Sequence, residues 1–166
     1  MTRKSNFKNG LLDQIRKPDL FRGELGETLL LAPPANGVRA KRILIVGVGD
    51  SESFAPNRME AVGSILYREA SRLGMAHPFF APAVLHAGVT KYSTGEIAEQ
   101  VRSGFLRAAE TEKTLKQQGA SAGNVVADLT YLAGSKFAGD TRKELKRLLP
   151  AKKARKGLME KTRFDF

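Results

Sequence analysis

The sequence predicts an α/β protein, namely a three-layer α/β/α sandwich around a mixed β-sheet. Short aliphatic runs alternate with longer amphipathic segments in the order β-β-α-β-α-β-α, and such helices can cover both faces of a sheet. Residues 43–46 are four consecutive aliphatic residues, a pattern typical of a strand covered on both faces. At 166 residues, the chain is long enough for one domain with a hydrophobic core.

The first two strands are expected over residues 28–32 and 41–48. Residues 33–37, which are rich in proline and glycine, lie between them and leave no room for a helix. Parallel neighbours need a connection of roughly a dozen residues or more. We therefore predict that these two strands pair antiparallel.

The first long helix is expected to begin at Asn57, a plausible N-cap with a glutamate three residues later. Apolar residues recur at helical spacing from position 59 to 73, and Gly74 is suited to end the helix in the left-handed conformation. A strand over residues 75–81 should follow. Pro78 and Pro82 favour the edge of a sheet for this strand, because proline has no backbone N–H to donate.

The second long helix begins at a predicted capping box formed by Ser93 and Glu96. Its expected buried stripe consists of Ile97, Val101, Phe105 and Ala108. A further strand is expected over residues 129–132. The last amphipathic helix should open near Asp140 and end before Pro150, where proline cannot continue it.

Three segments are predicted from composition: a basic N-terminal segment with a short helix over residues 1–22, the α/β domain over 23–150, and a basic tail over 151–166. Residues 24–135 contain eleven basic and eleven acidic side chains, so that part is electrically neutral. The net charge of +11 therefore belongs to the two ends of the sequence.

Clustered basic side chains can bind polyanions by releasing counterions. Two interpretations of the basic end remain open. One is a solvated tail that keeps the protein soluble, and the other is a segment that binds nucleic acid. The candidate polyanion-binding residues are Lys143, Lys146, Arg147, Lys152, Lys153, Arg155 and Lys156.

Gly47 and Gly49 follow the second strand directly and are followed by Asp50, so these three residues are a candidate ligand loop. The dinucleotide-binding fingerprint requires a third glycine three residues after the second, and that position is Glu52. Two acidic side chains would also repel a pyrophosphate. The alternative interpretation is structural: the glycines let the strand turn sharply.

No catalytic residue, metal ligand or cofactor is predicted from the residues. The chain contains no cysteine and two histidines, which have no carboxylate at a helical metal-binding spacing. It contains neither a P-loop nor a Gly-x-Ser-x-Gly elbow. No apolar run is long enough for a signal peptide or a membrane span, so we expect a cytoplasmic protein without a membrane partner.

Three stretches resemble the N-terminal domain of the cytosolic leucyl aminopeptidases. They are Gly-Glu-Leu-Gly-Glu-Thr-Leu-Leu-Leu over residues 23–31, Pro-Ala-Asn-Gly over 34–37, and Arg-Ile-Leu-Ile-Val-Gly-Val-Gly over 42–49. The resemblance extends over about residues 20–149 and implies a macro-domain-like, non-catalytic domain that helps to hold an oligomer together. An additional first strand of the family is not expected here, because the corresponding segment is polar and basic.

In the family, a catalytic domain follows this one and supplies a two-metal site with an Asn-Thr-Asp-Ala-Glu-Gly-Arg motif. The 166 residues do not contain that motif, so no catalytic or metal residue carries over. We therefore expect a stand-alone, non-catalytic module for binding, assembly or regulation, with a protein partner or a second copy of itself. The alternatives are nucleic-acid binding, a ligand pocket near residues 47–50, and a truncated remnant of a metal-dependent aminopeptidase.

Overall fold

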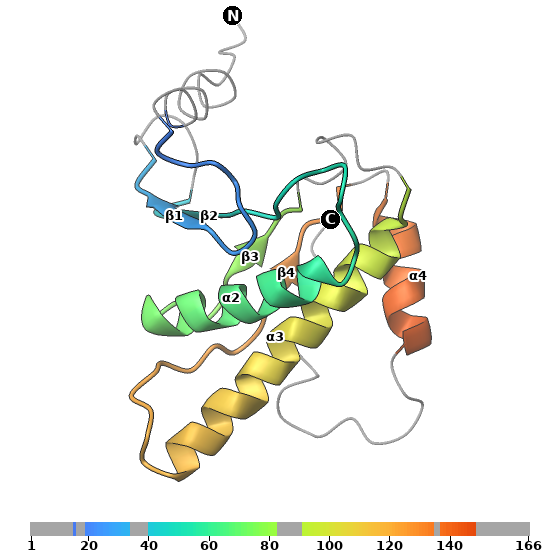
Figure 1. The fold of residues 1–166 in the computed structure, drawn as a ribbon. Coiled ribbons are helices and arrows are strands. Elements are labelled where there is room, and N and C mark those ends of the chain that lie inside the picture. Colours follow the sequence, from blue (N-terminus) through green and yellow to red (C-terminus); the bar gives the residue numbers. More distant parts are fainter. Residues whose placement is uncertain (1–14, 16–18, 34–39, 83–90, 135–136, 149–166) are drawn as a thin grey trace, which may run out of the picture. The chain divides into compact units, whose positions relative to one another are not determined.

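The computed structural model describes residues 15, 19–33, 40–82, 91–134 and 137–148. The chain divides into two compact units, Met1–Ser53 and Phe54–Phe166. The elements, shown in Figure 1, are β1 (Thr28–Leu31), β2 (Ile43–Val46), α2 (Arg58–Arg72), β3 (Phe79–Phe80), α3 (Thr94–Gln117), β4 (Thr130–Tyr131) and α4 (Ala138–Leu148). Their order is the predicted one. Within residues 1–22, where a short helix is expected, the structure describes Ile15, which is helical and buried, and residues 19–22, which are not helical.

Two two-stranded sheets are present among the described residues. β1 pairs antiparallel with β2, as predicted, and β3 pairs parallel with β4. Both pairing directions of a mixed sheet thus occur, but in separate sheets. The α/β class is confirmed, whereas the three-layer sandwich stays a prediction.

The residues of the β1–β2 sheet in the first unit are half-buried or exposed. Ile43 pairs with Leu31 at one end of the ladder, and Thr28 pairs with Val46 at the other. The four residues of β2 are all half-buried, and Leu30 on β1 is 41% exposed. The expectation of a strand covered on both faces therefore stays a prediction.

The β3 and β4 strands are shorter than the predicted ranges of 75–81 and 129–132. Pro78 precedes β3 and cannot donate to a ladder, although its carbonyl accepts the N–H of Thr130 at 3.0 Å. The N–H of Leu132 donates to the carbonyl of Phe80 at 2.8 Å. Among the described pairings β3 has a partner on one edge only, and its edge position in a larger sheet stays a prediction.

Helix α2 begins and ends where the sequence predicts, but its first turn is not capped by a side chain. Asn57 occupies the N-cap position without a side-chain hydrogen bond. The N–H of Glu60 instead donates to the carbonyl of Asn57 at 3.1 Å. At the other end Gly74 has a positive φ of 69°, and the N–H of Met75 donates to the carbonyl of Ala70 at 2.8 Å. This pair forms the predicted glycine-terminated helix end.

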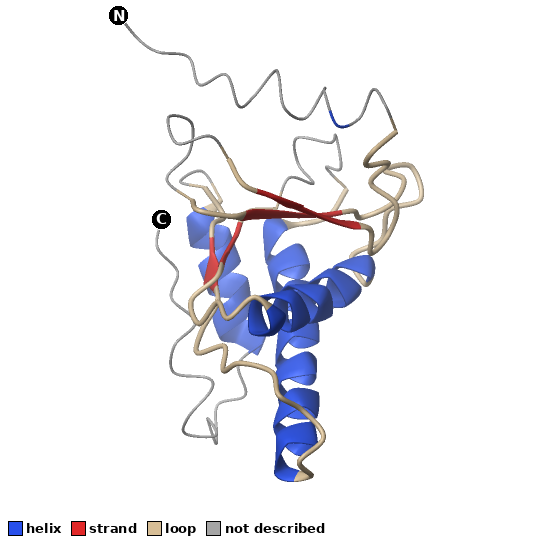
Figure 2. Cartoon of the chain, turned by 90° about the vertical axis from the view of Figure 1, so that its left-hand side faces the viewer, coloured by secondary structure: helices blue, strands red, loops and turns tan. Residues whose placement is uncertain are grey.

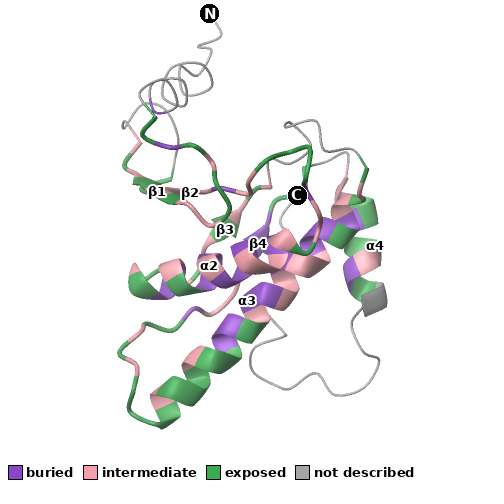
Figure 3. Ribbon diagram, viewed as in Figure 1, coloured by how far each residue is buried: buried purple, intermediate pink, exposed green. Residues whose placement is uncertain are grey.

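Helix α3 has the predicted capping box. The Ser93 hydroxyl accepts the N–H of Glu96 at 3.1 Å, and the Glu96 carboxylate accepts the N–H of Ser93 at 2.9 Å. Four residues of the predicted stripe are buried: Ile97, Val101, Phe105 and Ala108. Figure 3 shows that buried residues lie along the N-terminal part of α3, whereas the C-terminal end of the helix is mostly exposed.

Ser93→Ala should destabilise the protein by about 1 kcal/mol, because the N–H of Glu96 at the start of α3 loses the hydroxyl that caps it. Ser93→Thr keeps a hydroxyl and should lose less. Chemical denaturation of both variants measures the difference. Equal destabilisation by alanine and threonine would mean that the hydroxyl does not contribute.

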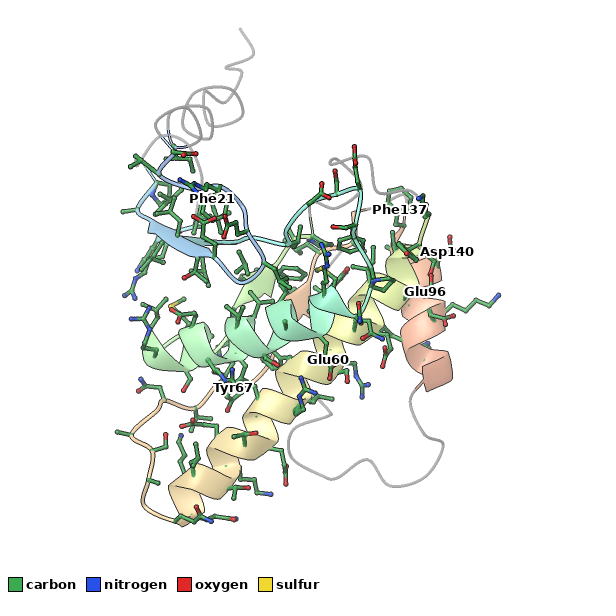
Figure 4. All side chains as sticks on the ribbon, viewed as in Figure 1. Phe21, Glu60, Tyr67, Glu96, Phe137 and Asp140 are labelled. Atoms are coloured by element: carbon green, nitrogen blue, oxygen red, sulfur yellow. The ribbon has the colours of Figure 1, made fainter. Side chains whose placement is uncertain are left out.

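Helices α2 and α3 cross with their backbones in contact in the second unit. The Ser64 hydroxyl of α2 donates to the carbonyl of Gly104 on α3 at 3.0 Å. A Cβ added to Gly104 would lie 2.7 Å from the carbonyl carbon of Glu60. Glu60, labelled in Figure 4, also forms an ion pair with Arg107 at 2.7 Å. Small residues on the two helices therefore allow the close crossing.

Helix α4 lies against the N-terminal part of α3. The hydroxyl of Thr141, which is completely buried, donates to the hydroxyl of Thr94 at 3.0 Å. A Cβ added to Gly95 would lie 2.7 Å from Cγ of Glu144. Leu145, one of the predicted apolar residues of this helix, is buried.

The segment between α3 and β4 has no regular secondary structure and runs back along the helices (Figure 2). Asn124 connects this segment to the end of α2: the side-chain amide of Asn124 donates a hydrogen bond to the carbonyl of Ser71 at 2.9 Å. The Ser71 hydroxyl in turn donates to the carbonyl of Asn124 at 2.8 Å. These two hydrogen bonds hold the segment in place, so that residues 126–131 lie at the face of α3.

Candidate functional site

The glycine pair after β2 is held by the chain itself. The N–H of Gly47 donates to the carbonyl of Glu27 at 2.8 Å, and the N–H of Gly49 donates to the carbonyl of Gly23 at 2.9 Å. A Cβ added to Gly47 would lie 2.6 Å from the carbonyl carbon of Gly23. The space beside Gly47, where a dinucleotide-binding loop would admit a phosphate, is therefore taken by backbone.

Asp50 organises the loop that follows. Its carboxylate accepts the N–H of Glu52 at 3.1 Å, and it accepts the N–H and the hydroxyl of Ser53 at 3.2 and 3.1 Å. Such short-range bonds are typical of aspartate in turns. These contacts give Gly47, Gly49 and Asp50 structural roles, and their role as a ligand loop stays a prediction.

Glu27 closes the turn that faces the glycine pair. Its carboxylate accepts the N–H groups of Arg22 at 3.0 Å, Gly23 at 2.6 Å and Glu24 at 3.1 Å. Desolvation by itself would raise the pKa of the Glu27 carboxyl. The three donors and the positive charge of Arg22 outweigh desolvation, so the pKa of Glu27 is lowered from 4.5.

This shift predicts a pH-dependent contribution of Glu27 to stability. Because the pKa is lower in the folded than in the unfolded chain, the contribution is complete above a pH of about 4.5 and is lost as the pH falls through the folded pKa. Glu27→Gln should therefore be less stable than the wild type near neutral pH and closer to it in acid. Thermal melts at neutral and acidic pH measure this, with Glu52→Gln as the control. A stability gap that did not shrink in acid would contradict the assignment.

The predicted polyanion-binding residues are only partly within the described residues. Lys143 and Lys146 are exposed on α4. Arg147 belongs to the same helix, and its side chain is outside the described part. The remaining predicted residues, Lys152, Lys153, Arg155 and Lys156, also lie outside the described residues. Their joint role stays a prediction.

A cavity that the sequence did not indicate lies in the second unit, between α3, residues 126–131 and α4. Its volume is about 30 Å³. Its walls are mainly apolar: Ala98, Val101, Phe105, Leu106, Val126, Ala127, Leu129 and Leu145. Arg102, Asp128 and Tyr131 add a guanidinium, a carboxylate and a phenol to this lining.

Tyr131 is the most unusual residue of the cavity. Its side chain is 3% exposed, and its ring packs edge-on against Phe80 with centroids 5.6 Å apart. Its hydroxyl is buried without a hydrogen-bond partner among the described residues. Burial strongly raises the pKa of Tyr131, so the phenol stays protonated and can donate.

The charged residues of the cavity differ in their partners. Asp128 is almost buried, and its carboxylate lies 2.9 Å from Nδ1 of His77. Arg102 is half-buried on α3, and desolvation lowers its pKa despite the opposing charge of Glu99. No ion pair of Arg102 occurs among the residues that the structure describes. The cavity thus combines one half-buried cation with one unused hydroxyl.

Little in the sequence indicates this arrangement. Arg102 lies one residue after Val101 and reads as the polar border of an amphipathic helix. Tyr131 reads as an ordinary strand residue. His77 lies at the surface beside the carboxylate of Asp128, and His86 lies outside the described residues, so the expectation that the histidines have no ligand role stays a prediction. Arg102 and Tyr131 are 29 residues apart in the sequence. The segment that returns from α3 to β4 brings both residues to the same cavity.

Neither a metal-binding cluster nor a membrane-spanning helix occurs among the described residues. No group of three or more histidine, cysteine, aspartate or glutamate side chains is placed there to hold a metal ion. Within the same residues, no helix combines the length and the hydrophobicity needed to cross a membrane.

Comparison with known proteins identifies the chain. Residues 6–119 match the N-terminal domain of the cytosol aminopeptidase family. A protein of Alkaliphilus metalliredigens (strain QYMF), described as a probable cytosol aminopeptidase, is 28% identical over 110 residues, which are 66% of this chain and 22% of the relative. The chain thus spans about a fifth of that relative's length. The match confirms the resemblance carried by residues 23–49, and the chain belongs to the cytosol aminopeptidase family through its N-terminal domain.

Proposed function

We propose that this chain acts as a non-catalytic module for binding, assembly or regulation in the cytoplasm, with a macro-domain-like three-layer fold. The observation that supports this role is the family match, which lies on the N-terminal domain of an aminopeptidase family. By the resemblance described above, peptide hydrolysis in this family belongs to the catalytic domain. The chain therefore contributes contacts rather than chemistry.

The activity assay tests the non-catalytic part of this proposal. The purified chain is incubated with a leucyl substrate and added Zn²⁺ or Mn²⁺, and release of the amino acid is followed. We expect no hydrolysis above the rate of the metal alone. Hydrolysis at enzyme-like rates that is abolished by a chelator would overturn the proposal.

Self-association is the form of assembly that the exposed apolar residues favour. Phe79 on the edge strand β3 is 67% exposed, and Val125 is 69% exposed. Large apolar side chains at an edge with unpaired backbone groups favour contact with another chain. The module would then use the second unit to bind a copy of itself.

Light scattering of the full chain tests self-association. We expect a mass that is a multiple of the monomer mass, and Phe79→Asp should shift the protein toward the monomer. Leu115→Asp is the matched control, because Leu115 is an exposed apolar residue at the far end of α3. A monomeric wild type, or equal effects of the two substitutions, would reject the edge strand as the contact.

Nucleic-acid binding is a second candidate, favoured by the exposed Lys143 and Lys146 on α4 and by the net charge of +11. If several phosphates are neutralised, affinity for duplex DNA should fall steeply with salt. Lys143→Gln combined with Lys146→Gln should lower both the affinity and the salt slope. A salt-independent affinity, or one unchanged after truncation at Pro150 together with these substitutions, would count against this role.

A further inference from the structure

We draw no further inference here: the strongest candidate, the side-chain pair of His77 and Asp128 beside the edge strand β3, belongs to the surface already proposed for self-association, and among the described residues no third ligand joins the pair to form a metal site.

Discussion

Gly104→Ala is expected to lower the free energy of unfolding by about 2–4 kcal/mol, the largest effect of any single methyl group in the second unit. The added Cβ would lie 2.7 Å from the carbonyl carbon of Glu60 and closer still to its oxygen. These are backbone atoms of α2, so a side-chain rotation cannot relieve the overlap. The two helices must move apart, which also weakens the hydrogen bond from Ser64 to Gly104.

Gly139→Ala is the matched control for this substitution. Gly139 also lies in a helix, α4, and a Cβ added there would meet no atom within 4 Å. Alanine has a higher helix propensity than glycine by about 1 kcal/mol in a helix interior, so the control should be neutral or slightly stabilising. If the close crossing is the cause, urea denaturation should show a lower free energy of unfolding for Gly104→Ala and an unchanged or slightly higher one for Gly139→Ala.

The partner position on α2 provides a second check. A Cβ added to Gly63 would lie 2.9 Å from the backbone nitrogen of Phe105. Gly63→Ala should therefore destabilise the protein through the same separation of α2 and α3. Once the helices have moved apart, the second methyl group has less effect, so the double variant should lose less stability than the two losses added. Simple additivity, or a harmless Gly104→Ala, would contradict a backbone contact at this crossing.

The long helices could be predicted because their signals are local. Ser93 and Glu96 are three residues apart and cap the same turn, and Ile97 and Val101 recur at the helical period. The close approach of Gly63 to Val101 and of Gly104 to Glu60 could not be predicted, since a glycine in a helix gives no sign of the partner that approaches it. The antiparallel pairing of β1 with β2 could be predicted from the short connection between them. The four aliphatic residues at 43–46 identify a strand but do not show how far it is buried.

The candidate site was predictable to a smaller extent than the fold. Gly47, Gly49 and Asp50 were correctly placed at the abrupt end of a strand, because glycine and aspartate act within their own turn. The cavity was missed because its polar groups come from two segments that each read as ordinary. Arg102 is a border residue of a helix and Tyr131 a residue of a short strand, and only the tertiary fold shows that the hydroxyl has no partner among the described residues.

Gly47→Ala is expected to have the largest effect in the first unit, a loss of about 2–3 kcal/mol in the stability of the β1–β2 sheet and its turn. The added Cβ would lie 2.6 Å from the carbonyl carbon of Gly23 and would also overlap the carbonyl oxygen of Glu24. Relief requires residues 23–27 to move away. This movement breaks the hydrogen bond from the N–H of Gly26 to the carbonyl of Gly47, now 3.1 Å long. Amide hydrogen exchange should show faster exchange across β1 and β2 and little change in α2 and α3.

Substitutions of Gly49 provide the comparison that distinguishes steric crowding from backbone conformation as the reason for a glycine at position 47. Its φ of +77° is left-handed, a conformation that asparagine tolerates better than alanine. Gly49→Asn should therefore be milder than Gly49→Ala. At position 47 the crowding is with backbone, so Gly47→Asn should be at least as damaging as Gly47→Ala. If asparagine relieved the defect at 47 as it does at 49, conformation rather than crowding would explain the glycine, and the space beside Gly47 would be open to a ligand after all.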